Sequence, residues 1–324
     1  MSRKTFIGLM AAIAAAGLVL IVLILVQSLR WDTPNHVAAE VTDVPVTTEA
    51  SVSPTDTPAS TATPSITATA TRLPTPSPMP TRSPTPKATY VVAIDPGHGG
   101  VDEGTYPYNP DGIYNYHESE VTLKIAQRLR RLLEAEGIEV VMIRDGDYGL
   151  NPDWEDVNGD GVHDIGDEAQ ARVDVANEAG ADLMLSIHLN ARTYDDGTIN
   201  TTYNGATTYY CNARPFSDKS LRLAELVHQA VLEDLTASGY EPFDQGILDD
   251  LEINDGGPQL HLIALGPASD RIARPSQMPA VLDEPLFATS DVENALLADE
   301  ATYDILAKAY ARAILQYLSE QETP

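Results

Sequence analysis

The chain has 324 residues, of which 48 are acidic and 20 are basic, and its formal net charge is −28. A surface this acidic repels phosphate groups, which argues against nucleic acid as a partner, and it attracts cations. Cys211 is the only cysteine. A single cysteine excludes an internal disulfide, and we expect Cys211 to be a buried strand residue.

The first 31 residues contain an apolar run from Phe6 to Val26 behind Arg3 and Lys4. At about 1.5 Å per residue, the run can cross a hydrocarbon core of roughly 30 Å. A cleavable signal peptide has a shorter apolar core and a small-residue cleavage site, so we predict a cytoplasmic N-terminus and a transmembrane signal anchor at residues 1–31. The positive charges place the rest of the chain outside the cell, tethered by one span to the cell membrane, or secreted if the segment is cleaved.

Residues 32–89 are rich in Thr, Ser and Pro and hold 11 of the 23 prolines. They contain too few large apolar residues to bury a core, so we predict a disordered linker. Up to Thr89 the charges nearly cancel, with 6 basic and 5 acidic residues, which leaves 14 basic and 43 acidic residues beyond it. The acidity therefore belongs to residues 90–324.

Residues 90–324 have a normal length for one domain, and short β-branched runs alternate there with patterns of helical period. The patterns predict strands at 90–94, 138–143, 182–187, 209–210, 260–265 and 280–282, and helices at 121–136, 168–178, 221–235 and 303–318. This order predicts an α/β fold with a mostly parallel sheet of about six strands and helices on both faces. We expect the polar stretches 200–204 and 241–257 to be surface loops.

Three side chains are candidate metal ligands: His98 after the first strand, Glu118 at the start of the first helix, and His188 after the third strand. Two imidazoles and a carboxylate can hold zinc and leave its fourth position free for water. Glu284 follows a late strand, so it can reach the same carboxyl edge of the sheet, where open α/β folds bind ligands.

Each candidate also has a structural interpretation. A histidine after a strand is often only hydrogen-bonded, and a glutamate in a first helical turn usually complements the helix dipole. Of the other histidines, only His117 has a placement that keeps it in reserve as a ligand; the rest are His36, His163, His228 and His261.

Residues 156–167 predict a calcium loop of the EF-hand or dockerin type. Position six is glycine, and the predicted ligands at positions one, three, five, seven, nine and twelve are Asp156, Asn158, Asp160, Val162 (through its backbone), Asp164 and Asp167. The alternative is an acidic surface turn. The loop leads into the helix predicted at 168–178, so we expect calcium to order that helix and the strand before His188.

The segment Asp95-Pro96-Gly97-His98-Gly99-Gly100 resembles the opening motif of the zinc-dependent N-acetylmuramoyl-L-alanine amidases, which hydrolyse the cell wall. The resemblance extends from Tyr90 to Leu318. It includes four later blocks in the family's order, namely Glu118 to Leu123, Ile143-Arg144, Arg172 with Ala176-Asn177, and Asp182 to Ala191. It implies that His98, Glu118 and His188 are the zinc ligands.

By the same resemblance, Glu284 is the general base, in a segment corresponding to 279–287. The family usually has glycine and phenylalanine after this glutamate, whereas this chain has Pro285 and Leu286, and Asp283 precedes it as a second carboxylate. Glu284 would take a proton from a zinc-activated water, and the hydroxide would attack the amide between N-acetylmuramic acid and L-alanine in peptidoglycan.

Two alternatives stay open at this point. One is another zinc hydrolase on the same scaffold, a peptidase or a deacetylase. The other is a catalytically weak wall-binding or regulatory module, which the neighbours of Glu284 suggest. We expect the protein to be a monomer.

Overall fold

The computed structural model describes residues 89–194, 196–253 and 260–322. The predicted anchor at 1–31 and nearly all of the linker at 32–89 lie outside these ranges. Among the described helices, none is long and apolar enough to span a membrane. The anchor therefore stays a prediction.

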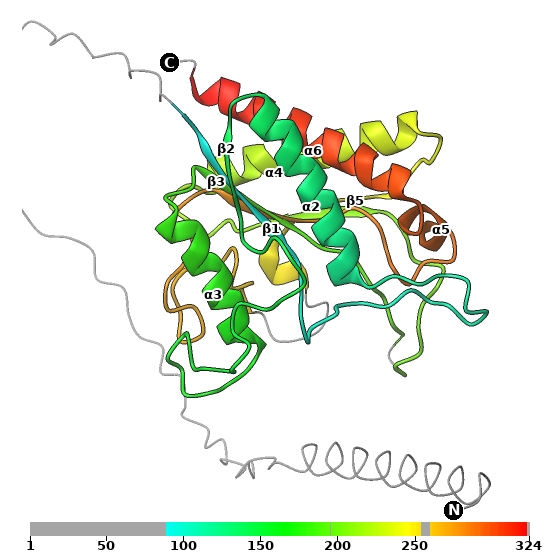
Figure 1. The fold of residues 1–324 in the computed structure, drawn as a ribbon, viewed down its shortest axis with the longest axis horizontal. Helices are drawn as coiled ribbons and strands as arrows, with labels where there is room; N and C mark the ends of the chain where they lie inside the picture. The colour runs from blue at the N-terminus through cyan, green and yellow to red at the C-terminus, as the bar shows by residue number, and fades with distance from the viewer. Residues whose placement is uncertain (1–88, 195, 254–259, 323–324) are drawn as a thin grey trace, which may run out of the picture. The chain divides into compact units, whose positions relative to one another are not determined.

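The domain is built on one six-stranded sheet (Figure 1). In spatial order its strands are β2 (Glu139–Met142), β1 (Val91–Pro96), β3 (Leu183–Ile187), β6 (Ala280–Glu284), β4 (Ala206–Tyr210) and β5 (Asp244–Asp249). Neighbouring strands are parallel except for β4 and β6, which are antiparallel. The predicted α/β class is confirmed, and the sheet is mixed.

Helices cover both faces of the sheet (Figure 1). One face packs against α2 (Glu118–Ala135), α4 (Ser217–Ala237) and α6 (Glu300–Gln321), and the short α5 (Glu293–Leu297) precedes α6. The other face carries α3 (Ile165–Glu178) and the short 3-10 helix η1 (Asp250–Ile253).

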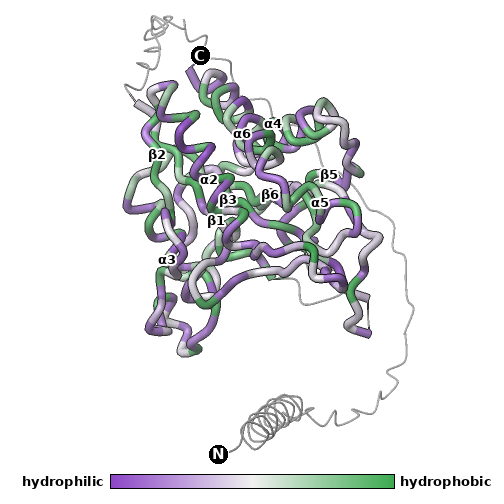
Figure 2. The backbone as a smooth tube through the Cα atoms, turned by 45° about the vertical axis from the view of Figure 1, so that its right-hand side comes forward, coloured by the Kyte–Doolittle hydropathy of each residue, from purple (hydrophilic) through white to green (hydrophobic). Residues whose placement is uncertain are grey.

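The period of the apolar residues explains this layering. Within α2, Val121, Ile125 and Leu129 recur at helical spacing, and all three are fully buried. Along β1 the side chains alternate, so Val92 and Ile94 join the core beneath α2 while the residue between them packs on the other side. Figure 2 shows the apolar residues concentrated in the centre of the domain, along the strands.

Two expectations about the second half of the domain were wrong. The predicted strand at 260–265 is a turn, in which Leu262 and Leu265 pack as loop residues against the second core cluster. The predicted loop at 241–257 instead contains β5 and η1. The sequence hides β5 because Asp and Gly interrupt its apolar residues, and Gly246 has a φ of 89°.

Candidate metal centre

The mainly parallel part of the sheet places the predicted residues at one edge. His98 lies two residues beyond β1, His188 directly follows β3, and Glu284 is the last residue of β6. These three strands are parallel neighbours, so their carboxyl ends meet. Glu118, the first residue of α2, reaches the same edge.

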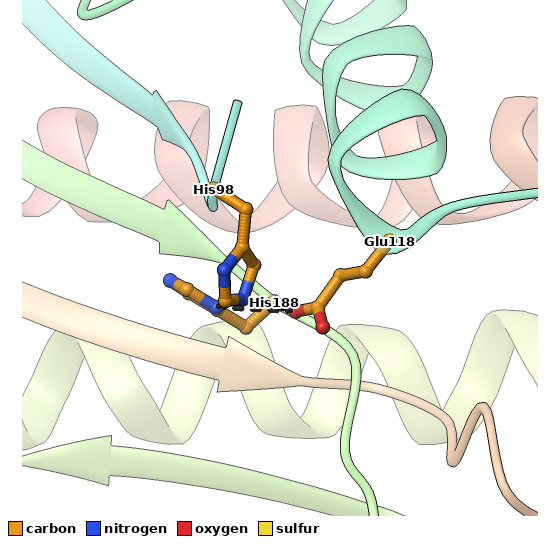
Figure 3. Close-up of side chains that lie close together, drawn as sticks. All are labelled: His98, Glu118 and His188. Carbon is orange, nitrogen blue, oxygen red and sulfur yellow. Dashed lines mark hydrogen bonds and ion pairs between the residues drawn. The ribbon is translucent and has the colours of Figure 1, made fainter. Parts of the chain in front are cut away.

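Three ligand atoms converge there (Figure 3). Glu118 Oε1 lies 3.1 Å from His98 Nε2 and 3.2 Å from His188 Nδ1, and the two nitrogens are 3.2 Å apart. A tetrahedral zinc ion with bonds of about 2.0–2.1 Å to nitrogen and 2.0–2.2 Å to oxygen holds such atoms about 3.3–3.5 Å apart. The near-equilateral triangle therefore fits zinc and leaves one coordination position free.

The carboxylate of Glu118 is ionised by its surroundings. Its side chain is 1 % exposed, and burial opposes ionisation, but hydrogen bonds and positive charge from His188 and His98 hold its pKa well below the ordinary value. Its oxygens also accept hydrogen bonds from the backbone N–H groups of Thr105 and Leu189. This anchoring aims one carboxylate oxygen at the imidazoles.

Asp102 orients the first imidazole, and the sequence analysis missed this residue. Its carboxylate lies 2.8 Å from His98 Nδ1, so Nε2 is the nitrogen that faces Glu118. Although burial lowers the pKa of His98, hydrogen bonds to Asp102 and Glu118 raise it to about 9. A carboxylate behind a ligating histidine is a common partner in metal sites.

The turn that carries His98 is strained and fixed by two arginines. His98 has a φ of 61°, in the left-handed region that non-glycine residues rarely adopt. The buried guanidinium of Arg144 donates to the carbonyls of Pro96 and Gly97, and Arg172 donates to the carbonyls of Pro96 and His98. These donors stabilise an unusual backbone that points His98 into the site.

Gly97 makes room for the second imidazole. A Cβ at this position would lie 2.5–2.7 Å from the ring atoms of His188. No real Cβ contact is that short, and the obstacle is a metal-ligand candidate, so this position requires glycine. The glycine of the motif therefore has a packing role beside its part in the turn.

Glu284 and Asp283 point to opposite faces of β6, as the alternation of a strand requires. Asp283 is fully buried on the helical side, where it accepts hydrogen bonds from Thr208 and Tyr310, and burial raises its pKa. It is therefore not a second carboxylate of the site. Pro285 lies beyond the end of β6, where its missing N–H costs the sheet no hydrogen bond.

Glu284 lines the same cavity as His98, Glu118 and His188, and its carboxylate makes no hydrogen bond with any residue that the structure describes. Burial, followed by the negative charges of Glu118 and Asp283, raises its pKa to about 8. A carboxyl group with a pKa near neutrality can both accept and return a proton.

All four residues line one cavity of about 570 Å³. This volume is within the range of small-molecule sites. The rest of the wall comes from β4, β5, η1 and loops, including side chains that the sequence analysis did not single out: Arg192, Tyr203, Tyr209, Gln245, Glu252 and Phe287. His117 precedes α2 and packs against Tyr106, so it is not among the converging ligands.

In the acidic loop at 156–167, the carboxylates accept hydrogen bonds from the backbone N–H groups of the same loop. Asp156 accepts hydrogen bonds from the N–H groups of Gly159 and Gly161, and Asp167 accepts from those of Val157, Asn158 and Asp164. Asp164 and Asp167 form a capping box at the start of α3. The side chains of this loop are not among the converging clusters of the described residues, and calcium binding stays a prediction.

Comparisons with known proteins agree with this geometry. Residues 92–316 match the family model described as N-acetylmuramoyl-L-alanine amidase. The chain is 28% identical over 246 residues to N-acetylmuramoyl-L-alanine amidase AmiA of Escherichia coli (strain K12), covering 70% of this chain and 75% of that protein. It is 26% identical to the germination-specific N-acetylmuramoyl-L-alanine amidase of Bacillus subtilis (strain 168), covering 72% of this chain and 82% of that protein.

The structural comparison points the same way. The crystal structure of N-acetylmuramoyl-L-alanine amidase from Clostridium difficile 630 matches with a TM-score of 0.52 and 27% identity, covering 72% of this chain and 100% of that one. This family is in general zinc-dependent, in keeping with the His98, Glu118 and His188 triangle. The family match spans most of the chain, and the protein therefore belongs to the N-acetylmuramoyl-L-alanine amidase family.

Proposed function

We propose that this protein hydrolyses the amide bond between N-acetylmuramic acid and L-alanine in peptidoglycan, with zinc held by His98, Glu118 and His188 and with Glu284 as general base. The observation that carries the proposal is the joint geometry of these residues. A triangle of ligand atoms with edges of 3.1–3.2 Å opens into the cavity that also contains the free carboxylate of Glu284.

Zinc, when bound, would supply a Lewis acid that lowers the pKa of a water from about 15.7 toward 7 and polarises the amide carbonyl. Glu284 accepts a proton from the attacking water, whose oxygen adds to the carbonyl carbon. The carbon–nitrogen bond then breaks, and Glu284 returns the proton to the departing alanine nitrogen. The products are a lactyl carboxyl group on the glycan and a peptide with a free amino terminus.

The arrangement around Glu284 argues for turnover and against a wall-binding module. Asp283 faces the opposite side of the sheet, and Pro285 leaves the strand intact. Neither neighbour therefore removes the base from the cavity. Peptidase and deacetylase activities use similar zinc chemistry, so the products must separate them from an amidase.

The location of the protein belongs to the same proposal. The apolar segment from Phe6 to Val26 anchors the chain in the cell membrane, and the linker carries the domain outward to the wall. The proposed calcium loop at 156–167 would stabilise the start of α3, the helix that carries Arg172.

The test is the product formed from purified peptidoglycan by the zinc-loaded, full-length protein. We expect the wild type to release new amino-terminal alanine, and we expect Glu284→Gln to release it at a far lower rate. New termini elsewhere in the stem peptide would identify a peptidase, and acetate would identify a deacetylase. Release of alanine by Glu284→Gln at the wild-type rate would exclude Glu284 as the base.

A further inference from the structure

A second cluster of metal-ligand side chains lies outside the cavity just described. Among the residues that the structure describes, only two groups of three place their ligand atoms within 4.8 Å of one another. The second consists of Cys211, Asp250 and His261. The proposed amidase chemistry uses none of these three residues.

The register of the sheet brings two members of this cluster together. In the parallel pair β4 and β5, Tyr210 is opposite Asp249. Cys211 and Asp250 are the next residues along each strand, so both side chains leave the same end of the pair. Both are buried, with exposed fractions of 1% and 0%.

His261 completes the cluster from the loop that follows. Its Nδ1 lies 2.9 Å from Asp250 Oδ1 and 3.5 Å from Cys211 Sγ. A Cβ on Gly266 would lie 2.4 Å from the Cβ of His261, so glycine is needed for this loop to hold the ring in place. Arg214 fixes the same loop by donating to the carbonyls of Gly266 and Ser276.

The geometry resembles an ion site more than a catalytic relay. A cysteine–histidine–aspartate relay uses both ring nitrogens, one toward the thiol and one toward the carboxylate. Here both groups face the single Nδ1 atom of His261. The sulfur–nitrogen edge of 3.5 Å matches a tetrahedral zinc ion with bonds of about 2.3 Å to sulfur and 2.0–2.1 Å to nitrogen. The nitrogen–oxygen edge of 2.9 Å is a hydrogen-bond distance, and it would lengthen by about 0.4–0.6 Å around the ion.

We propose that Cys211, Asp250 and His261 form a second metal site, which binds a zinc-class transition metal ion. Thiolate and imidazole ligands select zinc over calcium or magnesium. The surroundings are apolar, since Cys211 lies in the core cluster with Leu265 and Met278. Two anionic ligands in such surroundings are suited to a divalent cation, and the partly exposed ring of His261 marks the way in.

The site would act on the catalytic cavity through η1. This 3-10 helix begins with Asp250, a ligand of the proposed ion, and its later residues Glu252 and Ile253 line the cavity. An ion bound at Asp250 would hold that wall in place. The second site is thus a structural site whose loss loosens one side of the substrate cavity.

The test uses the full-length protein, reduced and stripped of metal, and then loaded with cobalt(II) or zinc. Because Cys211 is the only cysteine and the first triangle contains no sulfur, a thiolate-to-cobalt charge-transfer band can arise only from the second site. We expect this band in the wild type, and two zinc ions per chain. Cys211→Ser and His261→Gln should lose the band and retain one zinc ion.

His163→Gln is the matched control, because His163 is an exposed histidine outside both clusters, and it should keep both ions. A folded wild-type protein that binds one ion and shows no thiolate band would overturn the proposal, and this measurement needs no variant. Two zinc ions retained by folded Cys211→Ser would overturn it as well. The inference does not depend on the proposed amidase activity, since neither readout involves peptidoglycan.

Discussion

The two ligand clusters lie beyond opposite ends of the strands of one sheet and differ in what surrounds them. His98 and His188 follow β1 and β3, whereas Cys211 and Asp250 follow β4 and β5, which run the other way. The first cluster opens into a cavity of about 570 Å³ that Glu284 also lines, and the second is packed among apolar side chains. Convergence of ligands makes a metal site, but an open coordination position beside a cavity makes it catalytic.

The largest expected effect separates chemistry from metal binding at the open cluster, which consists of His98, Glu118 and His188. Glu284→Gln should lower kcat by about 10²–10⁴, the usual contribution of a general base. It should leave zinc content unchanged because Glu284 is not a ligand. Peptidoglycan hydrolysis and metal analysis on the same preparation check both statements, with the exposed Glu136→Gln as control. An equal loss of zinc and activity would instead make Glu284 part of the metal site.

A smaller effect should distinguish the two clusters through packing alone. Gly97→Ala places a Cβ within 2.5 Å of the His188 ring, at a backbone conformation that alanine tolerates. We expect zinc affinity at the open cluster to fall by about 10–100-fold, as when a supporting group is lost. The thiolate band of the closed cluster, which consists of Cys211, Asp250 and His261, should persist.

Gly146→Ala is the control for this prediction, because its added Cβ would meet only the ring of Tyr148. Competition with a chelator measures the affinity of each variant. Equal zinc affinity in Gly97→Ala and the wild type would show that the ring of His188 moves aside without cost.

The pH dependence of activity should belong to the open cluster only. The general base must be deprotonated, so activity is lost as the pH falls through the pKa of Glu284, which burial raises from 4.5 to about 8. A cation in the triangle attracts the carboxylate and lowers that pKa, so the midpoint should lie between these two values. A profile of kcat/KM at constant zinc occupancy measures it, and a flat profile from pH 4.5 to pH 8 would contradict the assignment.

The smallest expected effect concerns the loop at 156–167, which is neither cluster. A weak calcium site with a Kd of about 10⁻⁴–10⁻³ M would stabilise the fold by roughly 0.4–1.4 kcal/mol in millimolar calcium. Tm should rise by roughly 1–5 °C, and Asp156→Ala should abolish the rise. Calorimetry that shows no heat of calcium binding and no shift in Tm would contradict the calcium site and leave the loop only its role as a helix cap.

The parts of the site that could be predicted from sequence are those encoded locally. His98, Glu118 and His188 stand at ends of elements whose periodicity is clear, and the topology of parallel strands brings such ends together. Asp102 could not be predicted as a partner of His98, because their contact depends on a turn with φ of 61° at His98.

The closed cluster could not be predicted from the sequence for a different reason. Cys211 was expected to be a buried strand residue, and it lies buried directly after β4. The sequence shows no ligand placement for His261, and its pattern predicts a loop where β5 lies. Without the register of β4 and β5, nothing in the sequence relates position 211 to position 250.

The two arginines that donate hydrogen bonds to the His98 turn also make the geometry of the site depend on the folding of distant segments. Arg144 follows β2 and Arg172 belongs to α3, so the turn receives its donors from residues 46 and 74 positions beyond His98 along the chain. Until both crossover units have docked on β1, the turn lacks the groups that stabilise its strained backbone. We therefore expect the metal-binding geometry to assemble late, so that a partly folded chain would be inert and would gain its hydrolytic capacity only once the whole domain is complete.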